Sequence, residues 1–116
     1  MTVVSSQKRK GSRAELDVVK YLRTRGIKAD RIQAGTHADK GDVTGWPGVV
    51  IEVKDRQQHN WAEYFRQLAA QITNANAYTG VIMCKRPGQT NVAEWLAVMP
   101  VHEWINLLFM LEEKDQ

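Results

Sequence analysis

Two acidic residues and a lysine lie close together around a short apolar stretch of the chain. Asp42 precedes the sequence Trp-Pro-Gly at 46–48, and Glu52 and Lys54 alternate with hydrophobic residues just after it. Carboxylate oxygens are the ligands that Mg²⁺ and Mn²⁺ prefer, and an ammonium group nearby can stabilise a developing negative charge. These residue types suit the hydrolysis of a phosphodiester, in which a metal ion polarises the phosphoryl oxygen and activates a water.

The spacing of these residues predicts that they meet on one face of a β-hairpin. Side chains alternate along a strand, so Glu52 and Lys54 share a face. If 46–48 is a three-residue turn, Asp42 lies directly opposite Glu52, with Cβ atoms about 4.5–5.5 Å apart. Two carboxylates so placed repel each other unless a cation lies between them, which predicts a Mg²⁺ or Mn²⁺ site. The alternative is a salt bridge on the surface of an edge strand. The opposite face of the strand carries three apolar residues: Val49, Ile51 and Val53.

A third carboxylate, Glu15, belongs to the first predicted helix. The helical pattern runs from Ser12 to about Arg25, and Gly26 is a suitable C-terminal stop. Glu15 shares the apolar stripe of this helix with three residues: Val18, Val19 and Leu22. Ser12 and Glu15 also have the spacing of a capping box. Glu15 can therefore cap the helix, reach the metal through water, or do both.

The remaining pattern predicts a mixed-sheet α/β domain in the order α-β-β-β-α-β-β-α. The predicted helices are 12–25, 60–78 with Asn60 as N-cap, and 101–111. The predicted strands are 27–34, 42–45, 49–54, 80–85 and 94–99, and the segment 35–41 reads as a polar loop.

The last predicted helix is apolar on more than one side. Eight of its eleven positions are apolar: Val101, Trp104, Ile105, Leu107, Leu108, Phe109, Met110 and Leu111. A helix of this kind is covered on more than one face. In so small a domain the pattern favours a subunit interface over simple burial.

Length and composition indicate one domain in a chain of 116 residues with a net charge of +3. Positive charge is concentrated in residues 1–31, which hold nine Lys or Arg against three acids, so the rest of the chain is net negative. We predict a flexible basic arm over 1–10 and a globular domain over 11–116. A basic front end indicates a polyanionic partner such as nucleic acid, and a solvated helix face with a loose tail is the alternative.

The chain lacks an apolar run of the roughly 20 residues that span a bilayer, so no membrane association is expected. Its single cysteine, Cys84, excludes an internal disulfide and a multi-cysteine zinc site. The cytoplasm, in association with DNA, is the expected location, and Cys84 is expected to be a buried apolar residue.

Two stretches resemble known nucleases. Asp42 followed by Glu52-Val53-Lys54 resembles the signature of the PD-(D/E)XK nuclease superfamily, with Gly41 in place of its proline. The stretch RKGSRAELDVVKYLRTRGIKADRIQAGT (9–36) resembles the opening of the archaeal-type Holliday junction resolvases. The resemblance extends to about residue 85. It implies a restriction-endonuclease-like fold and a magnesium-dependent homodimer that cuts opposed strands of a four-way DNA junction.

The resemblance also implies roles for individual residues. Glu15 matches a catalytic glutamate borne on a helix, Asp42 and Glu52 match the metal-binding acids, and Lys54 matches the catalytic lysine. Matches to DNA-contacting positions are Arg31 near the scissile phosphate, Thr36 in place of a loop serine, and the basic residues Arg9, Lys10 and Arg13.

Several assignments stay open at this level. Gln71 or Gln67 can orient water or substrate, as a glutamine does in related nucleases, although ordinary polar helix positions are favoured. His37 and Trp46 have no assigned role. Two other functions are compatible with the sequence: a nuclease of the same fold acting on nicks, flaps or mismatches, and an inactive DNA-binding module.

Overall fold

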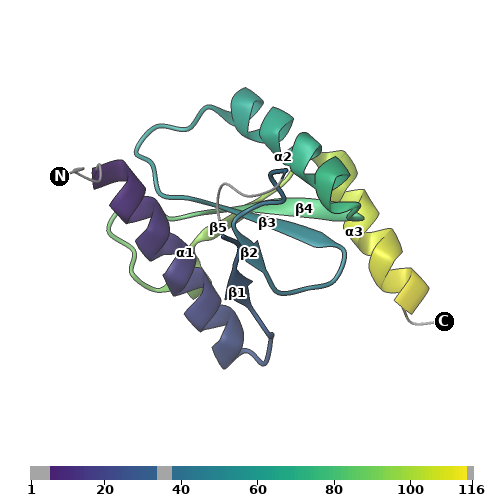
Figure 1. Ribbon diagram of the computed structural model, residues 1–116, viewed down its shortest axis with the longest axis horizontal. Coiled ribbons are helices and arrows are strands. Elements are labelled where there is room, and N and C mark those ends of the chain that lie inside the picture. Colours follow the sequence, from purple (N-terminus) through teal and green to yellow (C-terminus); the bar gives the residue numbers. More distant parts are fainter. Residues whose placement is uncertain (1–5, 34–37, 115–116) are drawn as a thin grey trace.

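The computed structural model describes residues 6–33 and 38–114, which form a five-stranded sheet with helices on both faces (Figure 1). The helices are α1 (Ser6–Thr24), α2 (Trp61–Ala75) and α3 (Val101–Lys114), with a 3-10 turn η1 (Val92–Glu94). The strands are β1 (Asp30–Arg31), β2 (Val43–Thr44), β3 (Val49–Lys54), β4 (Thr79–Cys84) and β5 (Leu96–Val98). The predicted order of helices and strands is confirmed.

The sheet is mixed, and its strands lie in the order of the sequence, β1-β2-β3-β4-β5. The pair β3–β4 is parallel and in register over six residues, while the other three pairs are antiparallel. A parallel pair needs a crossover connection, and α2 provides it. The strand β3, which carries Glu52 and Lys54, therefore lies at the centre of the sheet.

The two faces of β3 pack against different helices. Ile51 and Val53 belong to the core under α1, together with Val18 of that helix. Val50 belongs to the core under α2, where it meets Leu68. The predicted alternation is therefore confirmed, and Glu52 and Lys54 are on the α2 face.

Helix α1 starts earlier than its sequence pattern predicts. It begins at Ser6, so Ser12 lies within the helix and the predicted capping box with Glu15 is wrong. The residues from Gln7 to Lys10 are good helix formers, and Gly11 costs only about 1 kcal/mol relative to alanine, which the helix tolerates. Residues 6–10 of the predicted arm are thus helical, while residues 1–5 lie outside the described residues. The flexibility of the arm stays a prediction.

The end of α1 follows the prediction. Gly26 has a φ of 84°, the left-handed conformation expected of a helix C-terminal glycine. The N–H of Ile27 donates to the Leu22 carbonyl and the N–H of Gly26 to the Arg23 carbonyl, both at 3.0 Å. This is the Schellman arrangement, and it turns the chain from α1 into the sheet.

Helix α2 has the predicted start and a different end. The side chain of Asn60 accepts a hydrogen bond from the N–H of Glu63, so the N-cap is confirmed. The helix ends at Ala75, not at Tyr78, because Asn76 takes a left-handed conformation with a φ of 50°. Asparagine tolerates the left-handed region better than most residues do. In a sequence, however, it indicates the end of a helix less clearly than a glycine does.

Strand β1 is shorter than predicted: only Asp30 and Arg31 pair with β2, although the alternating pattern covers 27–34. The N–H of Ala29 bonds to the carbonyl of Ile27, and this local turn removes that segment from the sheet. Ile32 continues the contact by donating to the carbonyl of Asp42 at 2.9 Å.

In the described part of the chain, no helix is both long and apolar enough to cross a bilayer.

Candidate active site

Asp42 and Glu52 are brought together by the hairpin β2–β3. Val49 donates to the Trp46 carbonyl at 3.1 Å, and Gly48 has a φ of 84°, so the Trp-Pro-Gly segment forms the predicted turn. Val43 is paired with Ile51, which is the register that places Asp42 beside Glu52. The hairpin prediction is confirmed.

The backbone at Asp42 departs from a regular strand. Its N–H donates to the carbonyl of Ile51 at 2.9 Å, and its carboxylate accepts from the N–H of Val53 at 2.8 Å. The preceding Gly41 has a φ of 102°, which side chains disfavour, and a Cβ there would lie 2.9 Å from a methyl carbon of Val50. Glycine at position 41 is therefore needed to aim the Asp42 carboxylate across β3.

The carboxyl group of Asp42 has an unusual proton affinity. Burial raises its pKa to about 8, and contact with the carboxyl of Glu52 acts in the same direction. Glu52 itself is 5% exposed. Two carboxyl groups held together in the interior cannot both ionise easily without a positive charge.

Glu15 belongs to α1, and its carboxyl group lies next to that of Asp42. Its pKa is raised by burial and by Asp42, and lowered by Arg31. The guanidinium of Arg31 donates to one oxygen of Glu15 through Nε at 3.0 Å and Nη2 at 2.7 Å. The sequence-predicted residues Glu15, Asp42, Glu52 and Arg31 are thus linked, with Asp42 between the two glutamates.

Lys54 is positioned by α2. Its ammonium lies 3.4 Å from Oε1 of Gln67 and 4.9 Å from the centre of the Tyr64 ring. The hydroxyl of Tyr64 is in turn 3.1 Å from Nδ1 of His59. The charge of Lys54 lowers the pKa of Asp42, against the larger effects of burial and Glu52.

Gln71 is the most buried polar residue near these acids, with 1% of its surface exposed. Its amide nitrogen donates to Glu52 and, at 2.9 Å, to Asp39. Its carbonyl oxygen is buried and has no hydrogen-bond partner among the described residues. The favoured interpretation of Gln71 as an ordinary polar helix position is therefore wrong, because the side chain contacts a predicted metal-binding acid.

Asp39 is a residue that sequence reasoning missed. Besides the bond from Gln71, it receives one from Gln67 at 3.4 Å, and its backbone carbonyl accepts from Asn74 at 2.9 Å. Hydrogen bonds from Gln71 and from the N–H of Gly41 help to lower the pKa of Asp39, against the effect of its burial. The sequence feature that indicates such a partner is the i, i+4, i+7 spacing of three amide side chains on α2: Gln67, Gln71 and Asn74.

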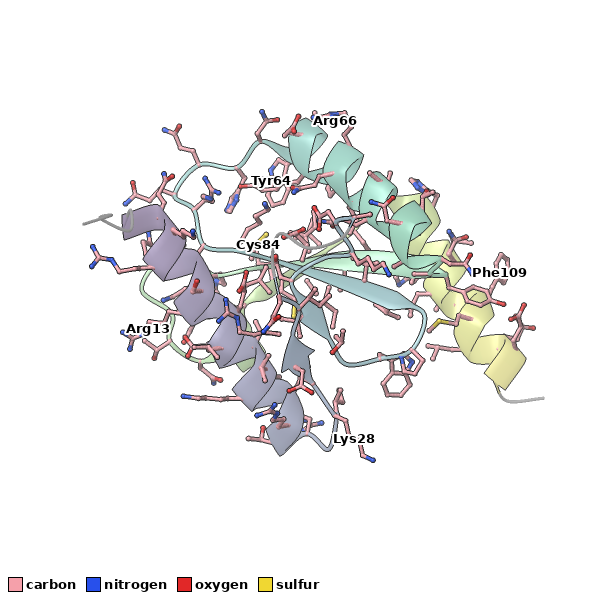
Figure 2. The ribbon with its side chains drawn as sticks, in the orientation of Figure 1. Arg13, Lys28, Tyr64, Arg66, Cys84 and Phe109 are labelled. Atoms are coloured by element: carbon pink, nitrogen blue, oxygen red, sulfur yellow. The ribbon has the colours of Figure 1, made fainter. Side chains whose placement is uncertain are left out.

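The basic residues of α1 are exposed. Arg9 and Arg13 point to solvent, and Figure 2 shows Arg13 directed away from the sheet. Lys10 lies 3.8 Å from Asp55, just beyond the end of β3. Thr36 and His37 lie outside the described residues. The structure therefore places a basic helix beside the acidic cluster but does not test the predicted DNA contacts.

Among the described residues, no group of three or more His, Cys, Asp or Glu side chains is arranged to hold a metal ion by itself. The available oxygen ligands are the carboxylates of Asp42 and Glu52, with Glu15 next to Asp42. Mg²⁺ commonly uses only one or two protein carboxylates and completes its shell with water and substrate phosphates. The donor set fits such an ion, and the mutual repulsion of Asp42 and Glu52 favours binding of a cation.

Comparison with known proteins adds a similar solved structure. No family model matches the chain, and a search of curated proteins finds no match. The solved structure of Hjc from Archaeoglobus fulgidus, a Holliday junction resolvase from an archaeal hyperthermophile, is 27% identical. The similarity covers 80% of this chain and 74% of that one, with a TM-score of 0.56. This chain therefore has a mixed α/β fold, with a five-stranded sheet flanked by helices, that is similar to the fold of this resolvase.

Proposed function

We propose that the protein is a Mg²⁺-dependent, structure-specific DNA endonuclease that cuts four-way junctions in pairs of nicks. The observation that carries the proposal is the buried pair of Asp42 and Glu52, in contact with each other within a fold similar to that of a resolvase. Paired nicks need two active sites, so the acting species is a homodimer. Mn²⁺ is expected to replace Mg²⁺, because both accept carboxylate oxygens.

Asp42 and Glu52 would hold the cation, which supplies Lewis acidity toward the scissile phosphate. The Val53 N–H and the Gln71 amide hold these two carboxylates in place. A carboxylate that needs no rearrangement at the moment of reaction contributes more to catalysis.

Lys54 supplies the positive charge that offsets charge developing on the phosphate. Its contacts with Gln67 and Tyr64 hold the ammonium on the same face of β3 as Glu52. Glu15 is the third acid, and its bond to Arg31 keeps an arginine at the edge of the site. Arg31 can exchange this carboxylate for a DNA phosphate, since a guanidinium binds both groups in the same geometry.

The exposed basic residues of α1 would contact the phosphodiester backbone. Among these residues, Lys10 lies next to the end of β3, 3.8 Å from Asp55, so a phosphate contact there would direct a strand toward the acids, while Arg9 and Arg13 extend the contact along the outer side of α1. Such contacts make affinity depend steeply on salt.

The test is cleavage of an end-labelled synthetic four-way junction, beside linear duplex, nicked and flap controls of the same sequence. We expect paired, symmetric nicks that require Mg²⁺ and are absent in Asp42→Asn and Lys54→Ala. Glu94→Gln, at an exposed acid of η1, is the matched control and should cut normally. Equal cutting of linear duplex, or preference for flaps or nicks, would mean that the four-way junction is not the substrate of this nuclease. Tight binding without cleavage in either metal would leave a DNA-binding module.

A further inference from the structure

Helix α3 packs against the domain with a face that is partly polar and exposes large apolar side chains. It buries Glu103, which is 6% exposed, and the hydroxyl of Thr79 in β4 donates to both the backbone carbonyl and the carboxylate of this residue. The half-buried Asn106 donates to the same carboxylate at 3.0 Å. Met110 is the one apolar side chain of α3 that is fully buried among the described residues. The face of the helix that packs on the domain is therefore mixed, with Glu103 and Asn106 beside the buried Met110 and the half-buried Leu107.

The outer face of α3 is apolar and open. Five large apolar side chains of this helix are between 42% and 75% exposed: Val101, Trp104, Leu108, Phe109 and Leu111. Figure 2 shows Phe109 projecting from α3 away from the sheet. Scattered exposed apolar residues are normal, but a continuous patch on one helix marks a surface that another macromolecule covers.

The spacing of the patch identifies the kind of surface that fits it. Val101, Trp104, Leu108 and Leu111 follow one another at intervals of three, four and three residues. That is the a/d spacing of a helix that packs lengthwise against another helix, over two heptads of the fourteen-residue α3. Phe109 and Ile105 flank the seam on one side.

The exposed charges at the two ends of α3, Glu112 and His102, favour one direction of the partner helix. Glu112 is exposed in the last turn, where negative charge is unfavourable for the dipole of its own helix, whereas the neighbouring Glu113 accepts a hydrogen bond from the hydroxyl of Tyr78 at 2.6 Å. The N-terminal end carries the exposed His102 and backbone N–H groups that have no acceptor within the helix. An antiparallel partner of the same sequence brings each acidic end to the other's N-terminus, whereas a parallel one brings the acids together.

We propose that α3 is the surface through which two copies of this chain pair, with their α3 helices antiparallel about a two-fold axis that crosses the seam midway between Trp104 and Leu108. In this register Val101 faces Leu111 and Trp104 faces Leu108, so the seam is complementary to itself. Figure 1 shows α3 on the side of the molecule away from α1, so pairing leaves the basic helix of each copy open to DNA. The choice of a second copy rests in part on the proposed paired cleavage.

Light scattering coupled to size exclusion tests the pairing directly. The wild-type protein should have twice the 13.2 kDa mass of one chain. Leu108→Glu should have the mass of one chain, and its circular dichroism spectrum should show that it is folded. Leu16→Glu, at an exposed leucine of α1 with 44% exposure, is the matched control and should stay a dimer. A monomeric wild-type protein, or a folded Leu108→Glu dimer, would overturn the proposal.

Oxidative cross-linking in a Cys84→Ala background tests the direction of the helices. Trp104→Cys with Leu108→Cys should give a covalent dimer, because antiparallel pairing brings 104 of one copy to 108 of the other. Leu108→Cys alone should cross-link poorly, and efficient cross-linking of that single variant would show parallel pairing instead.

Mass and cleavage, measured on the same preparations, separate this proposal from the proposed function. A dimer that does not cut junctions retains the α3 interface and loses the nuclease. A monomer that makes paired junction nicks would contradict pairing through α3 and support the proposed nuclease. Where both hold, Leu108→Glu should nick one strand of the junction without the paired second cut.

Discussion

The side-chain amide of Gln71 donates a hydrogen bond to the carboxylate of Glu52 in the interior of the domain. Glu52 is 5% exposed and Gln71 is 1% exposed, so neither group can exchange this bond for one to bulk water. The same amide nitrogen also donates to Asp39. One glutamine of α2 therefore connects the central strand β3 to the loop that precedes Asp42.

Replacing Gln71 by leucine should reduce both stability and activity. The substitution keeps the volume but leaves the Glu52 carboxylate without its donor, which we expect to cost about 1.5–3 kcal/mol of unfolding free energy. Loss of support for a metal-binding acid typically lowers activity by about 10–100-fold. Urea unfolding and junction cleavage measure the two effects. Gln67→Leu is the matched control, and its smaller effect should reflect contacts of 3.4 Å. Equal losses in both variants would contradict a specific role of Gln71.

Stability without metal should fall as the pH rises from about 5 to 8. The pKa of Asp42 in the folded protein is about 8, above its ordinary value of 3.8, so the folded state retains a proton that the unfolded chain releases. The unfolding free energy then decreases with pH, by at most about 1.4 kcal/mol per unit for one proton. Urea unfolding in a chelator between pH 5 and 8 measures the slope. Asp42→Asn should flatten it and be more stable than the wild type at pH 8. A wild-type stability that rises with pH relative to Asp42→Asn would contradict the assignment.

Mg²⁺ should stabilise the protein more at pH 8 than at pH 6. The cation competes with the proton on Asp42, so binding is weaker where that carboxyl is protonated. At a concentration 100 times the dissociation constant, a bound ligand adds about 2.7 kcal/mol of stability. Thermal unfolding with and without Mg²⁺ measures the shift, which should vanish in Asp42→Asn. An equal shift in that variant would place the binding site elsewhere.

Gly41→Pro, which introduces the proline of the nuclease signature that this stretch resembles, should abolish the proposed cleavage. Proline is confined to a φ near −65°, and Gly41 has a φ of 102°. Gly41→Ala should also lose stability, by more than about 1 kcal/mol, because its Cβ would lie 3.0 Å from the carbonyl oxygen of Ile51. Gly88→Ala is the matched control, since Gly88 has a φ of 74° with nothing within 4 Å of the added carbon. Cleavage and urea unfolding of the three variants test this, and an active Gly41→Pro would mean that the loop takes another conformation.

The hairpin could be predicted because its determinants are local. The Trp-Pro-Gly turn sets the loop length, the loop length sets the register, and the period of two assigns Glu52 and Lys54 to one face. The start of α1 could not be placed because residues 7–10 are all polar and so lack the apolar periodicity that marks the rest of the helix. The intrinsic propensities involved are fractions of a kcal/mol per residue.

The supporting residues depend on contacts between distant segments. Asp39 is 32 positions from Gln71, and a loop pattern does not indicate which helix it will contact. Gln71 looked like a surface residue because polar side chains on an amphipathic helix usually face solvent. Only the burial of Glu52 creates the need for a donor at that position. The acids of the proposed metal site could thus be selected from the sequence, and the groups that contact them could not.

Cys84 gives the protein an internal reporter of local opening. It is paired with Lys54 across β3 and β4, is 1% exposed, and burial raises the pKa of its thiol to about 11. A thiol reagent can modify Cys84 only when β4 moves away from the side chains packed on it. Cys84 is the single cysteine of the chain, so any labelling reports on this site. The labelling rate therefore measures, without any engineered probe, how often the strand next to Lys54 becomes exposed, and repeating it with added Mg²⁺ or DNA shows whether either one changes that opening.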